Sequence, residues 1–235
     1  MNLLLIGLMR FRKERKMYFS RVEVDSRNRQ KLSDLSHAGA YHNWVESAFT
    51  SERNEEIDGH RKRHLWRLEE LNGKKYLLIV SANKPNLNAL ECYGVAGSAV
   101  TKNYDSFLNN LYDSESLRFK LVANPTLKKA IPGKKQGRVI PVKQSELNTW
   151  ILNKQNQFGF EIDNNYQLEI KNKGWKQLYH KNNNGKNLVL LSEVTYEGIL
   201  RITNIKKFKD ALISGIGREK AYGFGLLTVA PIKKV

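Results

Sequence analysis

One histidine in the first quarter of the chain is the residue best suited to acid–base chemistry. His42 lies in a stretch from about residue 32 to residue 49, where apolar residues recur at steps of three and four, as in an amphipathic helix. An imidazole changes charge near neutral pH, so His42 can take up or release a proton under ordinary conditions. The residue also lies on the apolar stripe of this helix, where a histidine can serve packing alone. Both roles remain open from the local pattern.

The remaining histidines and the cysteine content argue against a metal centre. His60 and His64 lack the spacing of a metal site, and Cys92 is the single cysteine of the chain. One cysteine excludes a disulfide framework and a cysteine-rich zinc site. We therefore expect no metal and no cofactor, and any phosphodiester cleavage would be acid–base chemistry.

A glycine-rich segment near the carboxyl end predicts contact with an anion. It spans residues 215–225 and contains Gly215, Gly217, Arg218, Lys220, Gly223 and Gly225. Glycines allow the backbone to approach a partner closely, and successive free amides form an anion-binding concavity. A Walker loop would need Gly-Lys-Ser/Thr entering a helix, and a dinucleotide loop would follow a strand rather than a helix. A plain structural turn is the alternative, but the basic residues favour RNA.

The charge of the chain points to a polyanionic partner. Its 40 Lys and Arg against 23 Asp and Glu give a formal net charge of +17, for which nucleic acid is the leading partner and an anionic membrane the second. Residues 118–143 contain no acidic residue, and their basic side chains are Arg118, Lys120, Lys128, Lys129, Lys134, Lys135, Arg138 and Lys143. Lys181 and Lys186 flank a further turn signal at 182–185. Each run alone can be a solvated face, but together they predict RNA binding.

Length and composition indicate a folded protein of one large or two smaller domains. The chain has 235 residues, of which 40% are hydrophobic and 27% charged, so it is neither disordered nor collagenous. Residues 1–16 contain an apolar run that is too short to span a bilayer and is followed, not preceded, by basic residues. We expect these residues to be a non-native extension, the protein to start at Met17, and its location to be cytoplasmic.

The first half of the chain predicts a β-α-β-β-α order. We expect a strand over 17–24, the helix over 32–49, two strands over 64–69 and 75–80 around the hairpin pair Asn72-Gly73, and a short helix within 85–93. With room for one more strand before residue 107, this is the pattern of a ferredoxin-like unit.

The second half repeats the order more loosely. We expect a strand over 117–123, a basic loop over 126–141, a helix over 145–156, strands around 166–175, 175–180 and 188–202, a helix near 205–213, and a strand over 226–230. The fold class is therefore α+β, with two tandem ferredoxin-like (RRM-like) domains at residues 17–110 and 115–235.

Five segments resemble the CasE family, the CRISPR-associated endoribonucleases of type I-E Cascade within the RAMP superfamily. Residues 215–231 are similar to the glycine-rich signature of that family. The other four segments appear in the family's order, and they are Tyr18-Phe19-Ser20-Arg21-Val22, Arg63-His64-Leu65-Trp66-Arg67-Leu68, Arg118-Phe119-Lys120-Leu121-Val122-Ala123-Asn124-Pro125 and Tyr196-Glu197-Gly198-Ile199-Leu200. The likeness covers essentially residues 17–231.

The resemblance implies cleavage of CRISPR precursor RNA beside a repeat stem-loop, without a metal. In such enzymes a ribose 2′-OH attacks the adjacent phosphate and leaves a 5′-OH with a 2′,3′-cyclic phosphate or 3′-phosphate. The implied partners are the repeat stem-loop RNA and other Cascade subunits, with no membrane. The family histidine follows an Asp-Leu pair in the first helix, so Asp34-Leu35 places His42 on it and makes it the implied catalyst.

The sequence departs from the family at the second catalytic position. The family tyrosine stands three residues before the histidine, where this chain has Gly39, and Tyr41 is adjacent to His42 instead. We take Tyr41 as the second candidate, although a neighbour on a helix points about 100° away unless the helix is broken near Gly39. Tyr18 and Tyr222 are the other tyrosines that can replace it. The alternative functions are a non-catalytic RNA-hairpin-binding subunit and a generic basic RNA- or membrane-surface-binding protein.

Overall fold

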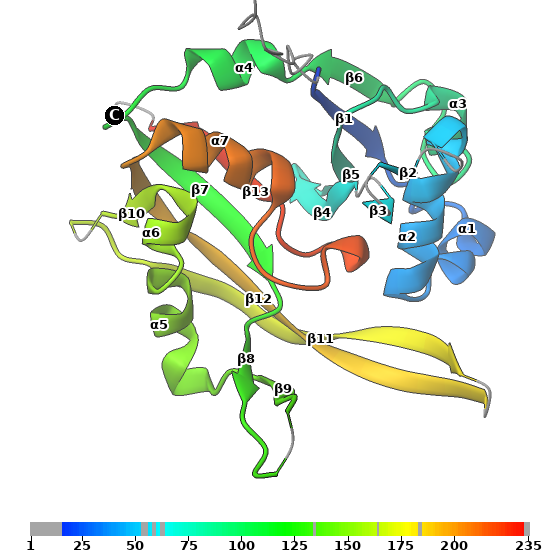
Figure 1. The fold of residues 1–235 in the computed structure, drawn as a ribbon. Helices are drawn as coiled ribbons and strands as arrows, with labels where there is room; N and C mark the ends of the chain where they lie inside the picture. The colour runs from blue at the N-terminus through cyan, green and yellow to red at the C-terminus, as the bar shows by residue number, and fades with distance from the viewer. Residues whose placement is uncertain are drawn as a thin grey trace, which may run out of the picture.

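The computed structural model contains two antiparallel sheets, each covered by helices (Figure 1). It describes residues 16–52, 56–57, 60–61, 64–133, 135–163, 165–182 and 185–232, with the backbone alone at 56–57, 60–61, 180–182 and 185–186. The expected extension before Met17 therefore lies outside the described residues except for residue 16. The expected division between 110 and 115 falls between the last helix of the first half and the first strand of the second.

The first half has the strand order of a ferredoxin-like unit. Its sheet runs β4-β5-β1-β6, so the first strand lies between the third and the last. The strands are β1 (Tyr18–Glu23), β4 (Leu65–Leu71), β5 (Lys74–Ser81) and β6 (Val100–Asn103). The helices are α1 (Arg29–Asp34), α2 (Ala38–Ser47), α3 (Leu87–Glu91) and α4 (Asp105–Asn110), with a 3-10 turn η1 (Thr50–Glu52) and a small ribbon of β2 (Glu56–Ile57) and β3 (His60–Arg61).

The single helix expected over 32–49 is wrong, because the chain forms two helices there. α1 ends at Asp34 and α2 begins at Ala38. The backbone at His37 is extended, and its Nδ1 accepts a hydrogen bond from the Ala40 amide, which caps the new helix. α2 then continues without a break past Gly39 and carries His42.

The second half repeats the order with longer strands. Its sheet runs β10-β12-β7-β13, and β11 pairs with the distal part of β12. The strands are β7 (Ser116–Ala123), β8 (Thr126–Lys129), β9 (Arg138–Pro141), β10 (Phe160–Ile162), β11 (Glu169–Asn182), β12 (Gly185–Ile202) and β13 (Leu227–Pro231). Its helices are η2 (Gln144–Glu146), α5 (Leu147–Leu152), α6 (Gln155–Phe158), α7 (Ile205–Ser214) and η3 (Lys220–Tyr222).

Two segments of the second half differ from the expected pattern. The stretch 126–141, expected to be a loop, contains the hairpin β8–β9, whose register pairs Thr126 with Pro141. The two strands expected around 166–175 and 175–180 form one continuous strand, β11. It pairs with β12, and the two project as a long two-stranded finger (Figure 1). Basic residues therefore lie on two protruding hairpins.

One of the hydrophobic clusters joins the two halves. α2 packs Trp44 and Val45 against the first sheet in one cluster. A larger cluster joins Leu65 and Val80 of the first sheet to Leu226 of the second half. Burial of apolar surface on this scale is the main force that holds protein halves together.

Arg67 ties the halves together with polar contacts. Its guanidinium is 2% exposed and donates to the carbonyls of Lys120 and Leu226, to Glu69 Oε2 and to the Thr228 hydroxyl. Burial lowers the pKa of Arg67, and the Glu69 carboxylate opposes this shift.

Among the helices in the described ranges, none has the length and apolar character needed to span a membrane.

Candidate active site and nucleic-acid interface

His42 lies on α2 with its ring against a tyrosine of the glycine-rich segment. The ring centroids of His42 and Tyr222 are 5.7 Å apart, edge to face. The His42 side chain is 32% exposed. Its Nδ1 is buried, has no hydrogen-bond partner among the described residues, and lies 4.0 Å from Glu46 Oε1. Burial of Nδ1 leaves Nε2 as the ring nitrogen available to a substrate.

Tyr41 has a different environment from His42. Its ring stacks on Trp66 at a centroid distance of 5.9 Å and contacts Trp44 at 6.2 Å. Burial raises the pKa of Tyr41, so its phenol stays protonated at neutral pH. Because α2 is unbroken at Gly39, Tyr41 and His42 project about 100° apart on the helix. The structure does not bring these two predicted catalytic residues together.

Tyr41 instead lines a groove at the start of α2. The groove has a volume of about 300 Å³ and lies between α2, β4 and β11. Its wall includes His37, Trp66 and the largely exposed Trp175 of β11. Tyr41 thus borders a groove that a ligand can enter.

Tyr222 is the aromatic residue that the sequence offered only as an alternative. It lies on η3, inside the glycine-rich segment, and α2 packs directly against this turn. In the sequence, Tyr222 is visible as an aromatic residue between glycines, but the sequence does not show that His42 is its neighbour in space. Only the packing of the two halves shows that Tyr222 contacts His42.

Three glycines of the segment are buried where the halves meet. A Cβ on Gly223 would lie 2.7 Å from the Trp66 ring, and one on Gly215 would lie 2.8 Å from Leu65. Gly225 packs equally closely against the Ile216 carbonyl. All three have positive φ, which glycine adopts without a steric penalty. The structure thus gives Gly215, Gly223 and Gly225 a packing reason, and their predicted contact with RNA has no support from their positions.

The rest of the segment faces outward in part. Arg218 is exposed, and Gly217 is half-buried next to the Trp150 ring. Lys220 donates from Nζ to the Ser214 carbonyl at 2.7 Å. Arg218 is therefore the member of the segment best placed for a phosphate contact.

The β8–β9 hairpin presents the densest group of basic side chains. Lys128, Lys129, Lys135 and Arg138 are all exposed on it, and Lys143 follows just beyond. Lys134 lies outside the described residues. At the end of the β11–β12 finger, the side chains of Lys181 and Lys186 are also outside the description, although their backbones pair with each other.

Lys120, predicted to contact RNA, is held by carboxylates. Its Nζ lies 2.5 Å from Glu69 Oε1 and 3.2 Å from Glu197 Oε1. The charge of Lys120 is thus compensated within the protein, on the side of β7 that faces the first half. This arrangement weakens the prediction that Lys120 binds phosphate.

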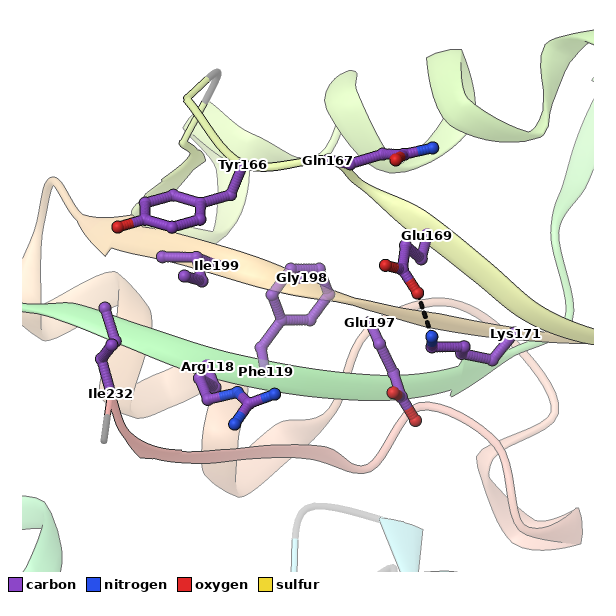
Figure 2. Close-up of a pocket in the computed structure, with 10 residues that line it drawn as sticks. All are labelled: Arg118, Phe119, Tyr166, Gln167, Glu169, Lys171, Glu197, Gly198, Ile199 and Ile232. Carbon is purple, nitrogen blue, oxygen red and sulfur yellow. Dashed lines mark ion pairs between the residues drawn. The ribbon is translucent and has the colours of Figure 1, made fainter. Parts of the chain in front are cut away.

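Arg118, two residues before Lys120, lies on the same face of β7 and lines a shallow pocket of about 420 Å³ (Figure 2). Figure 2 shows its guanidinium and the Glu197 carboxylate on this face, with Tyr166 at one end. Lys171 is paired with Glu169, which raises the pKa of Lys171. Two acids and two bases line the pocket, so it does not have the excess positive charge of a phosphate site.

Comparisons with known proteins give the family of the chain. A family model described as CRISPR associated protein matches residues 17–231. The chain belongs to this family. The match confirms the resemblance seen in the sequence and includes α2 and the whole glycine-rich segment.

Relatives of this CRISPR-associated family match over nearly the whole chain. A protein of Thermus thermophilus named CRISPR-associated endoribonuclease Cse3 is 26% identical over 227 residues, which are 92% of this chain and all of that one. A structure described as CRISPR endoribonuclease Cse3 bound to 19 nt RNA has a TM-score of 0.73 at 23% identity, again over 92% and 100%. The CRISPR-associated protein Cas6e from Escherichia coli has a TM-score of 0.59 at 20% identity, over the same shares. The expected tandem ferredoxin-like fold is confirmed.

Across the described ranges, no three His, Cys, Asp or Glu side chains are arranged to hold a metal ion.

Proposed function

We propose that this protein is an endoribonuclease that cleaves CRISPR precursor RNA beside the repeat stem-loop. The observation that carries the proposal is His42, a half-exposed histidine whose Nδ1 is buried and whose ring contacts Tyr222. Membership of the CRISPR-associated family and the 26% identity to a protein named as an endoribonuclease support it. A His42 side chain buried entirely in the hydrophobic core would instead have favoured a protein that binds RNA without cleaving it.

The proposed reaction uses the RNA's own 2′-hydroxyl as nucleophile. His42 Nε2 takes the proton from the 2′-OH, or gives a proton to the leaving 5′ oxygen, while the 2′ oxygen bonds to the adjacent phosphorus. The bond from phosphorus to the 5′ oxygen breaks, so the products are a 2′,3′-cyclic phosphate and a 5′-OH. Acid–base catalysis of this kind contributes about 10²- to 10⁴-fold in rate.

The proposed second group is a tyrosine hydroxyl near the same phosphate. Tyr41, named from the sequence, reaches solvent through the groove at the start of α2. The contact of Tyr222 with His42 favours Tyr222. Both side chains remain candidates until their hydroxyls are removed separately.

The proposed RNA-binding surface consists of Arg218 and the exposed lysine and arginine side chains of the β8–β9 hairpin. Stem-loop RNA is recognised largely by its shape and phosphates, which suits basic side chains on protruding hairpins. We propose that the protein then keeps the cleaved hairpin and joins other Cascade subunits in the cytoplasm. Structures described as CRISPR RNA-guided surveillance complexes contain chains of similar fold.

The decisive experiment incubates the protein with the CRISPR-repeat stem-loop RNA encoded nearest its gene. The reaction contains EDTA and compares wild type with His42→Ala, and a second RNA carries a 2′-deoxy nucleotide at the cut site. We expect wild-type cleavage to survive EDTA and to be lost with either change. Loss of about 10²-fold or more in His42→Ala would match removal of an acid–base group.

Other outcomes would overturn parts of the proposal. Tight binding without cleavage would favour the non-catalytic hairpin-binding subunit. Cleavage that persists in His42→Ala would remove the histidine from the mechanism. Equal affinity for stem-loop RNA, duplex DNA and anionic vesicles would favour a generic basic protein.

A further inference from the structure

A row of acidic and imidazole side chains runs inward from His42. His64 Nδ1 lies 2.9 Å from Glu46 Oε1, the same oxygen that lies 4.0 Å from His42 Nδ1. The other nitrogen of His64, Nε2, lies 3.4 Å from Glu52 Oε2. Asn83 donates from Nδ2 to Glu52 Oε1 at 2.6 Å. The row thus links His42, Glu46, His64, Glu52 and Asn83 in sequence.

The inner end of this row is buried. The side chains of His64 and Glu52 are 3% and 6% exposed, against 36% for Glu46. The His64 ring stacks on Phe49 at a centroid distance of 3.7 Å, with only 12° between the planes. The Asn83 carbonyl accepts a hydrogen bond from the Ser81 hydroxyl, which fixes the last member. Where His64 meets Glu52, Nε2 and Oε2 are buried and make no hydrogen bond among the described residues, so the contact between them is electrostatic.

A row of this kind costs desolvation that an apolar cluster would avoid. Buried carboxylates and imidazoles lose water and need partners, whereas α2 packs its other inward side chains, Trp44 and Val45, as ordinary core. The polar row starts one helical turn after His42 and points back to it. The position of this row next to His42 favours a role in supporting the His42 imidazole rather than a role in stability alone.

We propose that Glu46 is a positioning residue for His42, held in place by His64 and Glu52. The Glu46 carboxylate accepts a hydrogen bond from the Nδ1–H of His42. The neutral imidazole then keeps its unprotonated Nε2 free for the RNA. The hydrogen bond made by one ring nitrogen decides which nitrogen carries the proton. Since His42 Nδ1 is shielded from solvent and has no other partner among the described residues, the nearby carboxylate is the group that can fix this tautomer.

The spacing makes the contact reachable within one helix. Residues four apart on a helix lie on the same face, so Glu46 needs only a side-chain rotation to close the gap from 4.0 Å. His64 holds the same Glu46 oxygen on its other side, so the carboxylate stays close to both imidazoles. When His42 takes a proton, its positive charge and the carboxylate attract each other more strongly. The inference rests on the proposed function of His42 and adds its orientation.

The test separates orientation from stability in the full-length protein. We would make Glu46→Gln and, as a control, Glu70→Gln, an exposed glutamate at the far end of β4. Cleavage would be measured under single-turnover conditions, and affinity with the 2′-deoxy repeat RNA. We expect Glu46→Gln to lower the cleavage rate by about 10- to 100-fold with affinity unchanged, as for the carboxylates that orient histidines at metal sites. Glu70→Gln should match wild type in both measurements.

The tautomer of His42 gives a readout that a purely structural role would not move. Long-range ¹H–¹⁵N NMR correlations of the wild-type protein should show the neutral His42 with its proton on Nδ1. Glu46→Gln should shift this population toward Nε2–H. A wild-type His42 that carries its proton on Nε2 would overturn the proposal even if Glu46→Gln failed to fold. Failure of wild type to cut RNA would instead count against the proposed function, because the tautomer would still be measurable.

Discussion

At the scale of single residues, the proposed active site depends on which hydroxyl lies beside His42. Tyr41 is its neighbour in the chain, but Tyr222 is its neighbour in space. The Tyr41 ring is engaged with Trp66 and Trp44, and burial keeps its phenol protonated. A helix separates adjacent residues by about 100°, so sequence adjacency is the weaker guide here.

Removal of each hydroxyl separately should distinguish the two tyrosines. Tyr222→Phe keeps the ring that packs on His42 and removes only the oxygen, so we expect folding and RNA affinity to be unchanged. The single-turnover cleavage rate should fall by about 10²-fold if the hydroxyl moves or holds a proton at the phosphate. Tyr41→Phe serves as the matched control and should cleave at the wild-type rate. The reverse pattern would assign the second role to Tyr41, as the sequence predicted.

At the scale of elements, the β8–β9 hairpin carries the strongest expectation for RNA binding. Lys128, Lys129 and Arg138 are exposed on it, and the acid-free stretch 118–143 leaves their charges without an acidic residue nearby in the chain. In contrast, Lys120 on the adjoining β7 is neutralised by Glu69 and Glu197. Basic residues of one sequence block therefore have different environments, because two carboxylates hold Lys120 whereas the basic side chains of the hairpin are exposed to solvent.

Neutralisation of the hairpin should weaken RNA binding in a salt-dependent way. We would replace Lys128, Lys129 and Arg138 with Ala and measure affinity for the repeat stem-loop over a range of salt concentrations. Each lost phosphate contact should reduce the slope of log affinity against log salt by about 0.7 to 0.9. A matched triple variant at Arg27, Lys75 and Lys102, exposed on the first half, should keep the wild-type slope. Equal slopes in the two variants would show that the RNA does not use the hairpin.

The sequence predicted the elements better than their ends. The hairpin at Asn72-Gly73 has a local cause, since both residues adopt the positive φ that such a turn requires. The break between α1 and α2 was missed because the apolar steps of three and four continue across Leu35 and Ala38, both of which are buried. His37 ends this continuity by capping α2, a role that periodicity does not show. The row behind His42 was missed for a similar reason, since His64 and Glu52 meet α2 only after the first half has folded.

At the scale of the whole molecule, the glycine-rich segment connects the site to the interface between the halves. Its residues Ile216 and Phe224 are fully buried, and the Trp66 indole donates to the Ala221 carbonyl at 2.9 Å. Tyr222 lies between that hydrogen bond and Gly223, which packs on the same indole. The position of Tyr222 next to His42 is therefore set by how the second half docks on β4. The segment that the sequence singled out for RNA has a demonstrable role in assembling the site.

The effect of this docking should appear when Gly223→Ala and Gly73→Ala are compared in stability and in RNA cleavage. Gly223 and Gly73 both have positive φ, but a Cβ on Gly223 meets the Trp66 ring while one on Gly73 meets nothing within 4 Å. Gly73→Ala should therefore lower the free energy of unfolding by about 1–2 kcal/mol, from backbone strain alone. Gly223→Ala adds a steric clash in a packed interior, which costs about 1–3 kcal/mol more. Because that clash also displaces Tyr222, RNA cleavage should fall in Gly223→Ala and stay at the wild-type rate in Gly73→Ala. Urea unfolding and single-turnover cleavage of both variants check the two halves of this expectation, and equal losses of stability would contradict the packing role of Gly223.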